Sequence, residues 1–186
     1  RRVLFRSREW YQTFQDYRAR LVTLLDELIG FMEKNPAFKY YHLDGQTIVL
    51  EDYLEVRPEN RKRLQRLIKQ GRIIPGPWYV MPDEFLVSGE AMIRNLQLGF
   101  AISRAWGVEP MQVGYIVDIF GHNTQMPQLC RGFGMESVVA FRGVSNTESS
   151  AEFTWEGADG SAVIFYRLPD ESAYSNFFYK VRKPQL

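Results

Sequence analysis

Polar side chains that could carry chemistry follow four predicted strands of this chain, at the point where each strand ends. They are Asp44, Gln46, Asp83, Glu84, Asp118, His122 and Arg142. Because active sites of parallel α/β folds lie at the carboxyl ends of the strands, we expect these side chains to share one face. Carboxylates and an arginine that converge in this way suit a polyhydroxylated substrate or a cation.

Asp118 is the strongest candidate for a functional residue because it follows directly after a strongly apolar run. The residues from Val113 to Val117, and Ile119 beyond them, are mostly apolar or aromatic, so the acid lies where a buried strand reaches the surface. A buried carboxylate has to be hydrogen-bonded, metal-bound or catalytic, since an unpaired buried charge is too costly. Asp is also a favourable cap for a following helix, and the spacing alone leaves both roles open.

Other reactive or aromatic side chains have more ordinary interpretations. His122 could be a ligand, a general base or a hydrogen-bonded loop residue. Trp10 and Trp78 could stack on a sugar ring or fill the core. Cys130 is the single cysteine, so no internal disulfide is possible, and we expect it to pack rather than to act as a nucleophile.

The elements that must position these residues alternate between helices and strands. Hydrophobic spacing and capping residues predict helices over 8–34, 47–70 with an interruption near Pro58, 89–106 and 124–131. Strands are predicted over 38–43, 73–81, 111–117 and 137–141, with further strands between 153 and 168. This alternation favours a parallel sheet covered by helices, either an open α/β sheet or part of a barrel.

Composition narrows the class of protein. The chain has 186 residues, of which 45% are hydrophobic and 24% charged, and its formal net charge is +1. These values are typical of a soluble globular protein and give no electrostatic footprint for nucleic acid. No apolar run approaches the roughly 20 residues of a membrane-spanning helix. We therefore expect neither nucleic acid nor a membrane as a partner.

One run of residues resembles a segment of a known protein family. Gly114 to His122 reads GYIVDIFGH, and together with QMPQL at Gln125 to Leu129 it resembles the nucleophile segment of the family 38 glycoside hydrolases, the α-mannosidases. Further blocks of this resemblance follow in order along the chain after Ser7. They are REWY from Arg8, LDGQ from Leu43, GPWY from Gly76, MPDE from Met81 and SGE from Ser88. The LDGQ region is similar to bacterial members, some of which act on mannosylglycerate.

The resemblance implies part of a seven-stranded (β/α) barrel with parallel strands alternating with helices, and a retaining α-mannosidase acting on an α-mannoside carbohydrate. Asp118 would be the nucleophile and also a ligand of zinc (Zn²⁺). Trp10 and Phe120 match positions that contact the bound sugar, and Arg142 matches a strand-end arginine beside the nucleophile. A cytoplasmic bacterial protein is expected, and a homo-oligomer is compatible with the resemblance.

The chain departs from the family pattern at its ends. Phe5 and Ser7 stand where the family has its first His and Asp ligands, and residues 1–7 resemble a translated sequencing adapter. We therefore expect residues 8–186 to form the N-terminal part of the catalytic barrel, truncated at the C-terminus. A later His ligand and the acid/base Asp are expected beyond Leu186. Because one protein ligand is too few for zinc, we expect this segment alone to bind the metal weakly and to be inactive.

Two other classes of protein are alternatives to the mannosidase. The first is another metal-dependent barrel hydrolase, such as a polysaccharide deacetylase, which would need Asp and His pairs as ligands and base. The chain contains only two His residues. The second is a non-catalytic carbohydrate-binding module that uses Trp10, Trp78 and Phe120.

Overall fold

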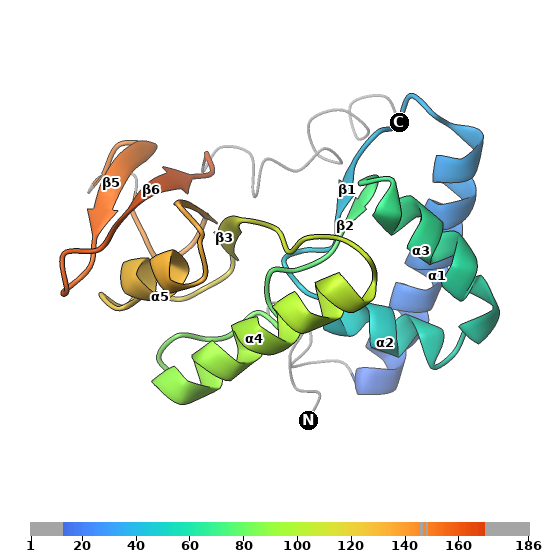
Figure 1. Cartoon of the computed structure of the whole chain (residues 1–186), viewed down its shortest axis with the longest axis horizontal. Coiled ribbons are helices and arrows are strands. Elements are labelled where there is room, and N and C mark those ends of the chain that lie inside the picture. The colour runs from blue at the N-terminus through green and yellow to red at the C-terminus, as the bar shows by residue number, and fades with distance from the viewer. Residues whose placement is uncertain (1–12, 146, 148, 170–186) are drawn as a thin grey trace. The chain divides into compact units, whose positions relative to one another are not determined.

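The computed structural model describes residues 13–145, 147 and 149–169, and the chain divides into two compact units (Figure 1). The first unit contains the residues up to Pro82 together with Ile93–Met111. The second contains Asp83–Met92 and the residues from Gln112 onward. The candidate residues that belong to the second unit are Asp83, Glu84, Asp118, His122 and Arg142.

Helix α1, Phe14–Lys34, opens the described part of the first unit. It begins at a capping box in which Thr13 Oγ1 accepts the Asp16 N–H at 3.2 Å and Asp16 Oδ2 accepts the Thr13 N–H at 3.3 Å. It ends at Asn35, because the residue before Pro36 avoids helical geometry. The predicted helix is confirmed from Phe14 onward, while residues 8–12 lie outside the described part of the chain.

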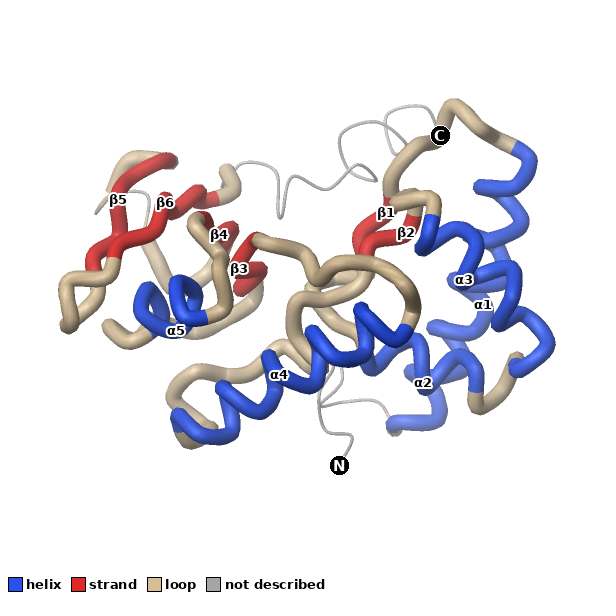
Figure 2. Tube along the Cα trace, viewed as in Figure 1, coloured by secondary structure: helices blue, strands red, loops and turns tan. Residues whose placement is uncertain are grey.

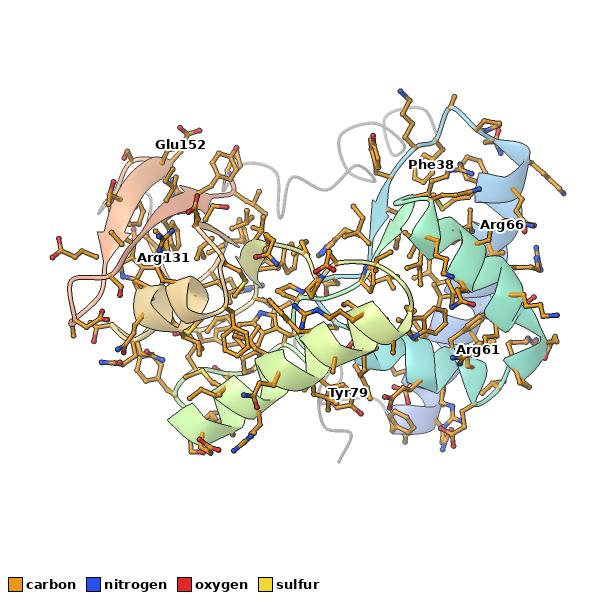
Figure 3. All side chains as sticks on the ribbon, viewed as in Figure 1. Phe38, Arg61, Arg66, Tyr79, Arg131 and Glu152 are labelled. Atoms are coloured by element: carbon orange, nitrogen blue, oxygen red, sulfur yellow. The ribbon has the colours of Figure 1, made fainter. Side chains whose placement is uncertain are left out.

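The second predicted helical region is interrupted at Pro58, as expected. It consists of α2 (Ile48–Leu54), a 3-10 turn η2 (Pro58–Asn60) and α3 (Arg61–Lys69). The three helices α1 to α3 pack around one apolar core (Figure 1). Its fully buried members are Leu25, Ile29, Met32, Leu50, Tyr53, Leu64 and Ile68. Arg61 and Arg66 project from α3 (Figure 3), where Arg66 forms an ion pair with Glu33 on α1.

The first unit also contains a short parallel sheet. Strands β1 (Tyr41–His42) and β2 (Ile73–Ile74) pair in parallel, and both are shorter than the sequence predicts. Pro75 and Pro77 lack the N–H group that a longer β2 would need for its ladder. Helix α4, Gly89–Ala105, matches its predicted range, and the side chain of Asn95 on it binds both the N–H and the C=O of Val80. Among the described helices, none combines the length and the apolar character needed to cross a bilayer.

The second unit is built on a four-stranded sheet with one helix against it (Figure 2). Its elements are β3 (Val113–Ile116), α5 (Met126–Gly132), β4 (Ser137–Ala140), β5 (Glu152–Glu156) and β6 (Ala162–Arg167). The order across the sheet is β3-β4-β6-β5, with β3, β4 and β6 parallel. Val163 and Phe165 are buried and Ile164 is exposed, which is the period-two pattern of a strand.

The expectation of a seven-stranded barrel with parallel strands alternating with helices is wrong for the part of the chain that the structure describes. The strands form two separate sheets of two and four strands, and β5 runs antiparallel to β6. The reversal follows from a tight turn, in which the Gly157 N–H donates to Ser161 O at 2.7 Å. A turn of this length can join only antiparallel neighbours, since a parallel connection needs a crossover of a dozen or more residues.

Candidate active site

Asp118 and Arg142 meet at the carboxyl ends of two neighbouring parallel strands. Ile116 of β3 is in register with Ala140 of β4, so the residues two positions further on each strand face one another. Arg142 Nε donates to Asp118 Oδ1 at 2.5 Å. Asp118 is buried at 6% exposure, whereas the side chain of Arg142 is 43% exposed. A buried carboxylate is therefore held by a charge-assisted hydrogen bond from a partly solvated guanidinium.

Phe120 lies on the solvent side of this pair. Its ring is 64% exposed, and the guanidinium carbon of Arg142 lies 5.6 Å from its centroid. The same carbon lies 6.0 Å from the ring of Phe141. Distances of this size allow a cation–π contact. Three of the four residues that the sequence analysis selected for the site, Asp118, Phe120 and Arg142, are thus brought together, whereas Trp10 lies outside the described residues.

The main chain of Arg142 is attached to the Asp118 segment at two points. Its N–H donates to Val117 O at 3.1 Å, and its carbonyl oxygen lies 2.9 Å from His122 Nε2. The other ring nitrogen of His122, Nδ1, lies 2.8 Å from Glu84 Oε1. Glu84 Oε2 accepts the Asn123 N–H at 2.7 Å. His122 therefore connects the loops that follow β3 and β4.

This histidine and its acid are enclosed. The side chains of His122 and Glu84 are 4% and 0% exposed. The His122 ring makes edge contacts with Trp155 at 5.7 Å and Phe165 at 5.8 Å between centroids. The sequence indicates Glu84 and His122 separately as strand-end residues but gives no sign of their pairing, because they lie 38 positions apart along the chain.

Gly143 makes the close approach of the two loops possible. Its φ is +84°, and a Cβ placed there would lie 2.8 Å from both Gly121 N and His122 Nε2 and 2.9 Å from Ile119 O. Those distances are shorter than a real Cβ tolerates, so only glycine fits without moving the loops. Gly143 was not among the residues predicted for the site, and its place directly after the strand-end Arg142 is the feature of the sequence that could have indicated it.

Asp44, Gln46, Trp78 and Cys130 are not part of this cluster. Asp44 and Gln46 belong to the first unit, where the Gln46 side-chain oxygen accepts the Met81 N–H at 3.3 Å. Trp78 is fully buried in that unit and so fills the core. Cys130 is also fully buried, and burial raises the pKa of its thiol to about 12, which makes it a poor nucleophile.

The described residues do not supply a zinc site by themselves. Within residues 13–145, 147 and 149–169, no group of three or more His, Cys, Asp or Glu side chains is placed to hold a metal ion. Asp118 is bound by Arg142 and His122 is bound by Glu84, and His42 contacts Gly76 O in the first unit. A catalytic zinc needs about three protein ligands. Of the expected set, these residues include Asp118 alone.

Comparison with known proteins identifies relatives of the whole segment. The family profile described as "Glycosyl hydrolases family 38 N-terminal domain" matches residues 8–181. A protein of Halalkalibacterium halodurans that carries the provisional name mannosylglycerate hydrolase is 40% identical over 170 residues, which are 85% of this chain and 19% of that protein. Alpha-mannosidase G of Dictyostelium discoideum is 27% identical over 170 residues, covering 88% of this chain and 15% of that protein.

A solved structure agrees with these sequence matches. The crystal structure of an alpha-mannosidase from Enterococcus faecalis V583 superimposes with a TM-score of 0.82 and 33% sequence identity. The superposition covers 94% of this chain and 22% of that structure. The chain thus spans between 15% and 22% of the length of these relatives.

Proposed function

Because this chain belongs to glycosyl hydrolase family 38, we propose that it is the segment of a retaining α-mannosidase that carries the catalytic nucleophile, Asp118. The observation that supports this role most directly is the buried carboxylate at the end of β3, held by Arg142 beside the exposed ring of Phe120. Family membership favours a glycosidase over the deacetylase and the non-catalytic binding module. Cytoplasmic location and homo-oligomerisation stay predictions.

In the proposed reaction, a carboxylate oxygen of Asp118 attacks the anomeric carbon of the mannosyl group. The bond from that carbon to the leaving oxygen breaks, and a second carboxylic acid protonates this oxygen. The product is an ester between the sugar and Asp118. A water molecule, deprotonated by the same second group, then attacks the anomeric carbon and releases mannose with its original configuration. The second acid lies outside the described residues.

Arg142 and Phe120 would prepare Asp118 and the sugar for this step. Arg142 Nε donates to one carboxylate oxygen at 2.5 Å, which restrains the position of that oxygen. Phe120 presents a largely exposed ring on which an apolar face of a sugar can rest. Trp10 is proposed as a further sugar contact on the family resemblance alone.

We also propose that the complete protein binds zinc, with Asp118 as one ligand. When bound, zinc acts as a Lewis acid that holds sugar hydroxyl groups. The other ligands have to come from outside the described residues, and the segment alone is expected to be inactive. Removing metal from the complete protein with a chelator should abolish turnover, and added zinc should restore it. Full activity in the metal-free protein would refute the zinc proposal.

The test uses the complete polypeptide that contains this segment and an aryl α-mannoside, with mannosylglycerate as a second substrate because a 40% identical relative carries that name. We expect Asp118→Ala to lower the turnover rate by at least about 1,000-fold, since removal of a nucleophile removes the covalent route. Glu152, an exposed acid on β5 (Figure 3), provides the control Glu152→Gln, which should leave the rate unchanged.

Azide distinguishes a lost nucleophile from general damage. In Asp118→Ala, azide can attack the anomeric carbon from the side that the carboxylate has vacated, releasing the phenolate of an activated aryl α-mannoside. The product would then be a β-mannosyl azide, with its configuration inverted. Formation of that product supports Asp118 as nucleophile. An intact protein that hydrolyses no α-mannoside would refute the activity, and an active Asp118→Ala variant would refute the role of Asp118.

A further inference from the structure

We propose that His122 and the buried Glu84 are positioning residues that hold Arg142, and through it the carboxylate of Asp118, in the geometry needed for reaction. This role rests on the proposed function, because Asp118 and Arg142 are the residues proposed to act on the sugar. Glu84, His122 and Arg142 lie in the same unit and form one continuous chain of contacts that ends at Asp118.

The contacts connect the buried Glu84 to the carboxylate of Asp118 through His122 and Arg142. Glu84, fully buried, lies 2.8 Å from His122 Nδ1, and His122 Nε2 lies 2.9 Å from Arg142 O. The Arg142 N–H donates to Val117 O, directly before Asp118. Both peptide groups of Arg142 are therefore hydrogen-bonded, one to Val117 and one to His122. The fixed main chain places Cα of Arg142 at the position from which its guanidinium reaches Asp118 Oδ1.

The acceptors on either side of His122 determine where the protons are. Arg142 O is a carbonyl oxygen, which only accepts, so His122 Nε2 carries a proton. Glu84 Oε2 accepts the Asn123 N–H. One further proton must therefore lie between Glu84 Oε1 and His122 Nδ1, on one of the two atoms, for their 2.8 Å contact to be a hydrogen bond.

Given these proton positions, the substitution Glu84→Gln can keep every hydrogen bond of the Glu84–His122 pair. In Glu84→Gln the amide NH₂ can donate to Nδ1 of a neutral imidazole, and the amide oxygen can still accept the Asn123 N–H. Nε2 keeps its proton and its bond to Arg142 O. Glutamine also has nearly the same volume as glutamate. A positioning role predicts that Glu84→Gln retains function, whereas a role in proton transfer or metal binding predicts that it does not.

His122→Phe is the disruptive variant. It keeps an aromatic ring against Trp155 and Phe165 but removes both ring nitrogens. In the complete protein we expect kcat on an aryl α-mannoside to fall on the order of 10- to 100-fold with little change in KM, the size of effect that follows loss of a group orienting a ligand residue. Glu84→Gln should stay within about threefold of wild type, which is a smaller loss than the tenfold minimum expected for His122→Phe.

A double-mutant comparison tests whether His122 acts through Arg142. If it does, His122→Phe combined with Arg142→Met should be no slower than Arg142→Met alone, because the arginine to be positioned is already absent. If the two losses multiply instead, the proposal is overturned. Circular dichroism and the thermal midpoint of each variant establish that it is folded, and Glu152→Gln serves as the unchanged control.

A second readout needs no substrate and so separates this inference from the proposed function. Phenylglyoxal modifies exposed guanidinium groups, and the rate of modification at Arg142 can be followed by peptide mass spectrometry. We expect faster modification in His122→Phe and the wild-type rate in Glu84→Gln. An intact protein without mannosidase activity would remove the proposed function but leave this readout valid. Loss of function in folded Glu84→Gln, or wild-type behaviour of His122→Phe in both assays, would overturn the positioning role.

Discussion

Gly143 offers a quantitative test of the packing between the two loops that carry Asp118 and Arg142. The perturbation is Gly143→Ala, which adds one methyl group at a residue with φ of +84°. The matched control is Gly160→Ala in the turn between β5 and β6. Gly160 has nearly the same φ, +81°, but a Cβ there would meet nothing within 4 Å. The two variants share the backbone cost and differ only in the collision.

The magnitudes follow from the structure. Alanine with positive φ costs about 1–2 kcal/mol, and both variants should lose that stability. At Gly143 the added Cβ would also lie 2.8 Å from Gly121 N and 2.9 Å from Ile119 O, which are backbone atoms that cannot rotate away. Separating the loops breaks the hydrogen bond between His122 and Arg142, which contributes about 0.5–1.5 kcal/mol to the free energy of unfolding. We therefore expect Gly143→Ala to lose about 1–2 kcal/mol more than Gly160→Ala, including the strain of the displaced loop.

The assay is the rate of aryl α-mannoside hydrolysis by the complete protein, together with the urea midpoint at which that activity is lost. Displacement of Arg142 should lower the rate of Gly143→Ala on the order of tenfold, since 1.4 kcal/mol of lost transition-state stabilisation is a factor of ten. Gly160→Ala should keep the wild-type rate. Equal rates and equal midpoints for the two variants would refute the reasoning, because the collision would then have no consequence.

Two further predictions concern titratable groups away from the site. Because burial raises the pKa of Cys130 to about 12, iodoacetamide at pH 8 should leave the native thiol unmodified and alkylate it after unfolding in urea; rapid native labelling would contradict its enclosure. Burial pushes the pKa of Asp26 upward, but hydrogen bonds from Tyr53 and Arg57 outweigh it and leave that pKa below its usual value. The stabilisation from Asp26 is thus present above its unfolded pKa, about 3.9, and is lost as the pH falls through the folded value. Between pH 7 and pH 3 the thermal midpoint should fall further in wild type than in Asp26→Asn, and parallel curves would contradict this linkage.

Features that depend on a few neighbouring residues were predictable from sequence. The end of α1 before Pro36, the break at Pro58 and the range of α4 follow from proline and from apolar spacing, which act within one or two turns of helix. The meeting of Asp118 and Arg142 was also predictable in outline. Residues that end adjacent parallel strands lie at the same edge of the sheet, so knowing the strands was enough.

Features that depend on distant segments were not predictable in this way. The barrel expectation failed because strand pairing is non-local, and the sequence pattern of β5 and β6 does not say whether they run parallel. Strands β1 and β2 were overestimated because an apolar run continues past the point where backbone partners are available. The pairing of Glu84 with His122 joins residues 38 positions apart, and neither has a local neighbour that requires the other.

The helices, the apolar strand that ends at Asp118 and the family of the segment could all be predicted from the amino-acid sequence, because each depends on short-range spacing or on ordered motifs. Strand pairing, the antiparallel return of β5 onto β6, and the contacts of Glu84 and His122 that connect the Arg142 loop to the Asp118 loop became visible in the folded chain. The physical reason is the same in each case. Local propensities act within a few residues, whereas hydrogen bonds between strands and the burial of a polar pair depend on which distant segments the packed core brings together.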